Sequence, residues 1–391
     1  MPGADPTQRS SKPVVMTEDG AEFHRQCLVI DGHNDLAWQI YKLAGGSLDR
    51  MNLAESQTER HTDIVRLRRG GLGAQFWAAF VPCSAMREGG CVRIALEQID
   101  IVHRMVARWP ETFALGRSPE DIEHIHRSGR IASLIGIEGG HAIENSLAVL
   151  RTFHALGARY MTLTHSDSTD WCDAATDAPK HNGLTPFGRE VVAEMNRLGM
   201  IVDVAHTSVK AMHDVLDVSR VPIINSHSGV LALASHPRNI PDDVIRRIAA
   251  GGGLVMVNFY SGLLYPPAAE ATARMFDVDR ELRTRNPDPD DYARAHDAYW
   301  TAHPVPRGTV HNLVDHIDHV VKVAGIDHVG LGSDFDGVGT TPEQVDDVSC
   351  YPFITQALLD RGYAKSDIRR ILGENLMRVF RRVVGFADSP A

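Results

Sequence analysis

Five side chains that can bind a metal ion follow short apolar runs of this chain. The runs lead into His33 and Asp35, Glu138, His206 and His227. Imidazole and carboxylate ligands without thiolates suit zinc best, and manganese, cobalt or iron can occupy the same ligands. A carboxylate such as Glu138 can also bridge two cations about 3.5–4 Å apart, an arrangement that hydrolyses amides. The residue types therefore indicate a metal-dependent hydrolytic centre.

Each of these residues also has a purely structural interpretation. His33 and Asp35 could be a capping pair in a loop, because the His-x-Asp pattern recurs elsewhere in a chain with 20 histidines. Glu138 could form a salt bridge, for example to Arg159, since an unpaired carboxylate at the end of a buried strand is costly. The two later histidines could each be held by hydrogen bonds alone. We favour the metal centre because all five residues occupy equivalent positions after an apolar run.

The elements that must position these residues are eight apolar runs that alternate with amphipathic stretches. The runs cover residues 28–33, 73–82, 131–138, 159–165, 200–206, 222–227, 253–259 and 328–334. The amphipathic stretches cover 92–106, 146–156, 188–198, 209–218, 242–249 and 310–323, and they predict an outer layer of helices. Alternation of this kind is typical of βα units. We therefore predict an α/β fold, a (β/α)8 TIM barrel whose strands end at one shared face.

One segment interrupts this alternation. Residues 261–307 are rich in proline and contain two charged helical pieces after the seventh run. Because βα loops surround the active site of a barrel, we expect this insertion to be a lid or a subunit contact. The remainder of 18–391 is expected to form one metallohydrolase domain, and 1–17 a flexible N-terminal tail.

Composition restricts the classes of partner. The 391 residues are 43% hydrophobic and 23% charged, with a formal net charge of -10 and no basic block, which argues against nucleic-acid binding. No apolar run approaches the length that spans a membrane, and no secretory signal is found at the start, so a cytoplasmic protein is expected. The five cysteines have irregular spacing and are expected to be reduced.

Seven motifs together resemble the membrane dipeptidase family, also called renal-type dipeptidases. They are DGHNDLAW (31–38), GIEGGHAI (136–143), YMTLTHSDSTDW (160–171), IVDVAHTS (201–208), INSHSGV (224–230), HPRNIPDD (236–243) and GLGSDFDGV (330–338), and the resemblance extends from about 25 to 383. It implies a metal-dependent (β/α)8 barrel of the amidohydrolase superfamily with two Zn2+ per subunit. In that arrangement His33 and Asp35 hold one ion, His206 and His227 hold the other, and Glu138 bridges them. A homodimer is also implied by the resemblance.

The same resemblance implies roles for further residues. His165 would stabilise the oxyanion, with a sixth metal ligand or a core histidine as the alternatives. Arg238 would bind the free carboxylate of the substrate, the alternative being a surface arginine. Asp334 would act as general base and acid, with Asp336 as the competing candidate. Tyr260 is a candidate for substrate binding, and three residues of nearby loops could line the pocket or merely pack: Trp38, Asp170 and Trp171.

The activity implied by the resemblance is hydrolysis of dipeptides by a metal-bridging hydroxide. L-Xaa-D-Xaa dipeptides are included among the implied substrates, because the family accepts a D-residue at the second position. Two alternatives stay open from the sequence: hydrolysis of another small amide, such as an N-acyl amino acid or a β-lactam, and a catalytically silent binding or scaffold protein.

Overall fold

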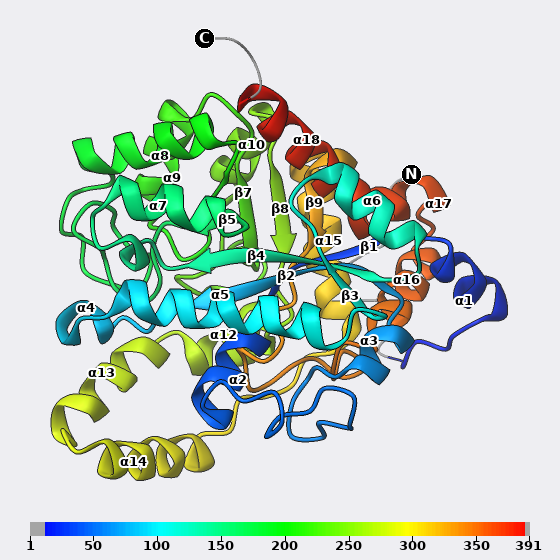
Figure 1. Cartoon of the computed structure of the whole chain (residues 1–391). Helices are drawn as coiled ribbons and strands as arrows, with labels where there is room; N and C mark the ends of the chain where they lie inside the picture. The colour runs from blue at the N-terminus through cyan, green and yellow to red at the C-terminus, as the bar shows by residue number, and fades with distance from the viewer. Residues whose placement is uncertain (1–11, 388–391) are drawn as a thin grey trace.

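The computed structural model describes residues 12–387, and its centre is a closed barrel of parallel strands (Figure 1). Each of the eight barrel strands pairs in parallel with two neighbours. They are β1 (Val29–Asn34), β2 (Leu72–Phe80), β4 (Ile131–Glu138), β5 (Ala158–Thr162), β6 (Ile201–Asp203), β7 (Ile224–Ser228), β8 (Leu254–Val257) and β9 (Val329–Leu331). Every one overlaps a strand predicted from the sequence, so the predicted (β/α)8 barrel is confirmed.

One strand lies outside this ring. β3 (Phe113–Leu115) pairs with the first residues of β4, before β4 turns to pair with β5. β3 was not predicted from the sequence, because three residues are too few to show a periodic pattern.

Helices cover the outside of the barrel and follow its strands in turn. The crossover helices are α2 (Leu36–Ala44), α5 (Cys91–Arg108), α7 (Leu147–Ala155), α8 (Pro186–Leu198), α9 (Val209–Val218), α10 (Asp242–Ala250), α15 (Val310–Ala324) and α16 (Tyr351–Asp360). Local sequence sets their ends. Thr185 caps the start of α8 by accepting the Gly188 N–H, Pro186 occupies the first turn, and Gly199 ends the helix in the left-handed conformation. The six helices predicted from amphipathic stretches are all present.

The remaining helices are mostly short. They are α1 (Glu18–Arg25), α3 (Ile64–Arg69), α4 (Ala85–Glu88), α6 (Pro119–Arg127), α17 (Lys365–Arg369) and α18 (Asn375–Ala387), with a π-helical turn over Arg370–Glu374. α18 closes the end of the barrel where the strands begin. Its buried face forms one apolar cluster with interior side chains such as Ile30, Phe76, Tyr160 and Leu254. The opposite end, where the strands finish, is left for polar groups.

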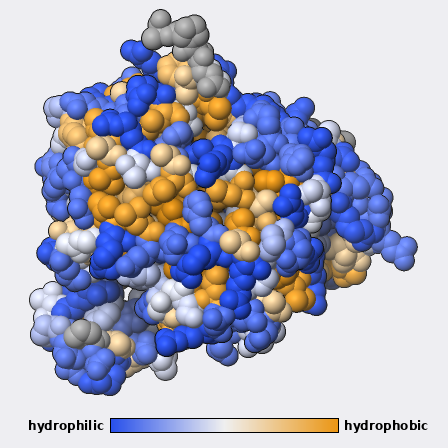
Figure 2. Space-filling model, viewed as in Figure 1, coloured by the Kyte–Doolittle hydropathy of each residue, from blue (hydrophilic) through white to orange (hydrophobic). Residues whose placement is uncertain are grey.

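The insertion predicted at 261–307 forms four helices between β8 and α15. They are α11 (Ser261–Leu264), α12 (Pro266–Thr272), α13 (Met275–Arg285) and α14 (Pro289–Ala302). α13 and α14 project from the barrel in Figure 1, and their face in Figure 2 is largely hydrophilic, whereas apolar residues gather near α5. Within residues 12–387, no helix is both long enough and apolar enough to cross a membrane.

Part of the predicted N-terminal tail, residues 1–11, lies outside the described residues. Residues 12–17 contact the folded chain. Val14 is buried and its N–H donates to Gln344, and the hydroxyl of Thr17 donates to Gln356. All five cysteines are buried free thiols.

Candidate metal centre and active site

Four barrel strands bring the predicted ligands to one end of the barrel. His33 lies in β1 with Asp35 just after it, Glu138 is the last residue of β4, His206 follows β6, and His227 lies in β7. All five side chains are buried. Because the strands are parallel, their C-terminal ends converge, and residues far apart in the sequence become neighbours.

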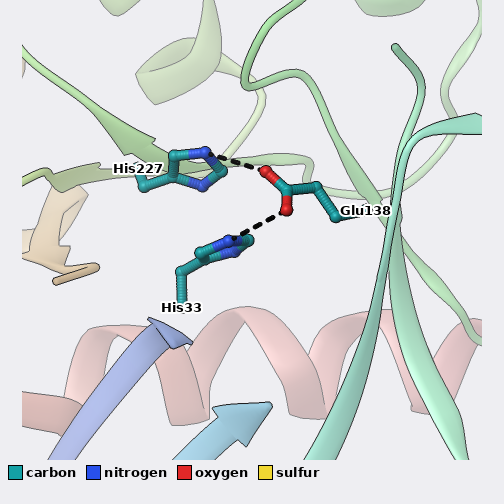
Figure 3. Close-up of side chains that lie close together, drawn as sticks. All are labelled: His33, Glu138 and His227. Atoms are coloured by element: carbon teal, nitrogen blue, oxygen red, sulfur yellow. Dashed lines mark ion pairs between the residues drawn. The ribbon is translucent and has the colours of Figure 1, made fainter. Parts of the chain in front are cut away.

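Glu138 is the centre of this group (Figure 3). Its Oε2 lies 3.4 Å from Nε2 of His33, and its Oε1 lies 3.5 Å from Nε2 of His227. Nε2 of His206 lies 3.3 Å from the same Oε1 and 3.0 Å from Nε2 of His227. Asp35 completes the cluster, with Oδ2 3.3 Å from Nε2 of His33.

The donor atoms fit divalent cations. Nε2 of His33 is buried and has no hydrogen-bond partner, which is costly unless a metal takes its lone pair. Three overlapping groups have ligand atoms within 4.8 Å of one another: His33, Glu138 and His227; Glu138, His165 and His206; and His33, Asp35 and Asp334. Imidazoles and carboxylates are ligands of zinc and related metals. Glu138 is shared between two of the groups, as a bridging ligand would be.

Electrostatics at this cluster favour a charged Glu138. Burial alone would raise the pKa of Glu138, but His33, His206 and His165 around it hold that pKa well below its usual range. Burial lowers the pKa of His165 to about 4, so its ring is neutral at pH 7. Burial also raises the pKa of Asp334, and the nearby charge of Glu138 adds to this effect. The cluster thus holds a carboxylate, a neutral imidazole and a second carboxyl group of weakened acidity.

Hydrogen bonds behind two of the histidines fix how their rings are presented. Nδ1 of His33 lies 2.8 Å from the hydroxyl of Tyr160, which also lies 3.1 Å from the carbonyl of Gly32. Nδ1 of His227 lies 2.7 Å from Oγ of Ser226, and that hydroxyl donates to Asp203 at 2.6 Å. Such contacts place the proton on Nδ1 and leave Nε2 free as a metal ligand. None of these four partners was predicted from the sequence.

Arg238 is buried, so the alternative of a surface arginine is wrong. Its Nη1 lies 3.3 Å from the hydroxyl of Ser228, and its Nη2 donates to the carbonyl of His227 at 3.1 Å. Burial lowers its pKa to about 10, so it remains charged at pH 7. Arg159 does not pair with Glu138 and instead donates to three backbone carbonyls. The proposed structural partner of Glu138 is therefore also wrong.

Asp334 and Asp336 have different surroundings. Oδ2 of Asp334 accepts a hydrogen bond from Asn258 at 2.8 Å, and Asp334 belongs to one of the three candidate ligand groups. Asp336 instead accepts the backbone N–H of His61 at 2.8 Å and donates its own N–H to that ring. Asp334, Asp336 and His206 all have positive φ, 63°, 67° and 62°, a strained conformation that occurs often at functional sites.

A cavity of about 330 Å³ opens beside the cluster, a size suited to a small molecule. The predicted residues that line it are Asp35, Glu138, His165, His206, Arg238, Tyr260, Asp334 and the competing candidate Asp336. Trp38 lines it as well, whereas Trp171 is buried in the core and the exposed Asp170 accepts a hydrogen bond from Asn145. Three further lining residues, Leu263, Met275 and Phe276, come from the insertion and were not predicted.

Comparison with known proteins identifies the family. The family model described as membrane dipeptidase, peptidase family M19, matches residues 18–389. The chain belongs to the membrane dipeptidase family. The resemblance seen in the sequence motifs is therefore confirmed, and so is the expected class of enzyme, a metal-dependent hydrolase of peptide bonds.

Curated relatives of this dipeptidase come from distant organisms. The chain is 38% identical to dipeptidase tcpJ of Claviceps purpurea (strain 20.1) over 367 residues, covering 92% of this chain and 78% of that protein. It is 36% identical to dipeptidase 3 of Mus musculus over 373 residues, covering 94% of this chain and 67% of that protein.

Solved structures with the same fold include the probable dipeptidase PvdM from Pseudomonas aeruginosa. It has a TM-score of 0.81 and 26% identity, covering 95% of this chain and 98% of that one. A metallopeptidase from Rhodobacter sphaeroides, solved with a phosphinate mimic of the dipeptide L-Ala-D-Ala, has a TM-score of 0.75 and 24% identity, covering 91% and 99% of the two chains. This dipeptidase thus shares its barrel with metallopeptidases.

Proposed function

We propose that this chain is a binuclear zinc dipeptidase that hydrolyses dipeptides, including L-Xaa-D-Xaa dipeptides. One observation carries the proposal: four buried ligands surround a fifth, Glu138, at the inner end of a cavity that also contains a buried, charged arginine. A catalytically silent scaffold would have no use for such a set of buried charges, which destabilise a fold unless they are paired or bind a metal.

The ligand set divides between two cations. His33 and Asp35 would hold one ion, His206 and His227 the other, and Glu138 would bridge them. Bound there, the two ions would supply a water molecule of lowered pKa as the nucleophile. The position of Glu138, with its two oxygens facing different histidines, supports this division.

Three residues of the chain would act on the substrate itself. Arg238 would bind the C-terminal carboxylate with its planar guanidinium. His165, neutral at pH 7, would donate an N–H to the carbonyl oxygen as negative charge develops there. Asp334 would take a proton from the attacking water and pass it to the departing amine, because its carboxyl group belongs to the ligand cluster and lines the cavity. Tyr260 would contribute to the wall around the substrate.

Substrate length follows from the position of Arg238. A guanidinium buried in the same cavity as the ligands would require a free carboxylate on the residue after the scissile bond, so internal peptide bonds of long chains would be excluded. The family resemblance supports acceptance of a D-residue there. The cytoplasmic location and the homodimer stay predictions.

The test compares L-Ala-L-Ala and L-Ala-D-Ala with L-Ala-L-Ala amide, using zinc-loaded protein and a chelated control. The two dipeptides should be cleaved with kcat/KM at least about 100-fold above that of the amide, because the amide lacks the charge that pairs with Arg238. In Arg238→Met this difference should disappear. N-acyl amino acids and a β-lactam are assayed with the same protein. Turnover of either that is faster than turnover of the dipeptides would contradict the dipeptidase proposal. So would a lack of hydrolysis of every substrate tested.

A further inference from the structure

The first turn of α13, a helix of the insertion, lies at the active-site cavity. Met275 and Phe276 both line the cavity, although the rest of α13 carries charged residues at or near the surface. None of the charged side chains of α13 lines the cavity. The insertion therefore presents only apolar atoms to a bound substrate.

Phe276 is one of several aromatic residues near His165, the candidate catalytic histidine. Its ring centroid lies 6.3 Å from that of His165, at an interplanar angle of 89°. The ring of Phe80 also lies near His165, at 4.7 Å, and Trp38 lies 5.0 Å from Phe80 in an edge-to-face contact. All three aromatic residues line the cavity, so the reacting carbonyl would lie beside aromatic surfaces.

The last residue of α12, three residues before α13 begins, lies beside the loop that carries Arg238. The ring of His236, two residues before Arg238, contacts the carbonyl of Thr272 at 3.2 Å. The hydroxyl of Tyr260 lies 3.8 Å from the sulfur of Met275. The substrate residue whose carboxylate pairs with Arg238 would therefore direct its side chain toward α13.

Arg280 of α13 contacts Asp167 and Thr176, and we call these two contacts the clasp because they hold α13 in this position. Nη1 of Arg280 lies 3.3 Å from Oδ1 of Asp167, and its Nη2 donates to the carbonyl of Thr176 at 2.9 Å. Asp167 follows His165 by two residues, so the clasp joins the insertion to the loop of the candidate catalytic histidine. Because two hydrogen bonds connect a single guanidinium to that loop, loss of Arg280 would release the first turn of α13.

We propose that Met275 and Phe276 select substrates with a large apolar side chain on the C-terminal residue, and that Arg280 positions them for this selection. This inference rests on the proposed dipeptidase function. A site lined by apolar atoms gains affinity with each buried carbon, and a difference of several methylene groups changes kcat/KM by about 10-fold or more. L-Ala-L-Phe should accordingly be cleaved at least about 10-fold more efficiently than L-Ala-Gly.

The experiment measures kcat and KM for these two dipeptides in the zinc-loaded full chain and in four variants. Phe276→Ala should lower the L-Ala-L-Phe to L-Ala-Gly ratio of kcat/KM by about 5-fold or more, with most of the change in KM, because the lost contact is made in both ground and transition states. Arg280→Ala should lower the same ratio. Two controls should leave it unchanged: Arg285→Ala, at an exposed position of the same helix, and Phe386→Ala, an exposed phenylalanine of α18.

Three results would overturn the inference. The first is a wild-type enzyme that cleaves L-Ala-Gly as well as L-Ala-L-Phe. The second is an equal loss for both substrates in Phe276→Ala with an unchanged thermal transition. The third is an equal effect of Arg285→Ala and Arg280→Ala on the ratio. In each case dipeptides are still cleaved, so the proposed function survives; a wild-type chain that cleaves no dipeptide would refute the proposed function and this inference with it.

Discussion

The hydroxyl of Tyr160 lies 2.8 Å from Nδ1 of His33, on the ring nitrogen opposite the one that contacts Glu138. Tyr160 is fully buried inside the barrel, and its hydroxyl also reaches the carbonyl of Gly32. A tyrosine in this position can accept a hydrogen bond from the His33 N–H and donate its own O–H to that carbonyl, which fixes the imidazole with Nε2 as the free acceptor.

Replacing Tyr160 by phenylalanine should weaken metal binding by about 10–100-fold, because it removes the hydrogen bond behind His33 while preserving most of the side-chain volume. Titration of the apoprotein against a competing chelator measures this affinity. Tyr363→Phe provides the matched control, since that hydroxyl donates to Asp318 in the outer helical layer. Equal zinc affinity in Tyr160→Phe and wild type would show that this contact does not support the site.

Asp334→Asn should retain bound metal and lose turnover by about 10²–10⁴-fold, because an amide cannot transfer the proton. Metal analysis and steady-state kinetics on the same sample check both parts. Asp336→Asn is the comparison, because Asp336 is engaged by His61. It should lower the thermal transition and keep far more turnover. If Asp336→Asn were the less active of the two, the roles assigned to them would have to be exchanged.

Gly337 lies against two of the site carboxylates. A methyl group at this position would overlap Oδ2 of Asp35 and Oδ1 of Asp334, whereas one at Gly339 would meet no atom within 4 Å. Gly337→Ala should therefore lower kcat/KM by about 10-fold or more through displaced carboxylates, and Gly339→Ala should leave it within about threefold. Similar kinetics for the two variants would mean that the carboxylates tolerate displacement.

A surface ion pair network predicts a pH-dependent contribution to stability. The hydrogen bond from Arg197, with Arg151 of α7 opposite, lowers the pKa of Glu194 on α8 from 4.5 to about 2. Because the pKa is lower in the folded state, the stabilisation is complete well above pH 4.5 and fades as the pH falls toward 2. Glu194→Gln should cost about 1 kcal/mol at pH 7 after allowance for solvent screening.

Urea unfolding of wild type and Glu194→Gln at pH 7 and pH 3.5 measures this contribution, and the difference between the two proteins should be smaller at pH 3.5. Glu190→Gln, an exposed glutamate on the same helix, should cost little at either pH. A difference for Glu194→Gln that does not change with pH would rule out the ion pairs as its source.

The barrel and the positions of the ligands could be predicted because both depend on local patterns. Strands buried on both faces appear as apolar runs, and each polar residue at the end of a run had to lie at the same rim. His33, Glu138, His206 and His227 all follow this rule. The three-residue β3 could not be recognised, because it has no pattern of its own.

Contacts between distant residues could not be predicted from one sequence. Tyr160 and His33 are 127 residues apart, and nothing near Tyr160 distinguishes it from other core aromatics. The clasp between Arg280 and Asp167 spans 113 residues and joins helix α13 to a loop. The positive φ of His206 depends on how its loop leaves the barrel. These features arise from packing, which a local pattern does not contain.

The metal content of purified, active protein tests the central claim most directly. Elemental analysis of protein that releases amino acids from L-Ala-D-Ala should find about two transition-metal ions per chain. Chelation should remove both the ions and the activity, and added zinc should restore them together. Full activity in protein that contains no stoichiometric metal would contradict the account.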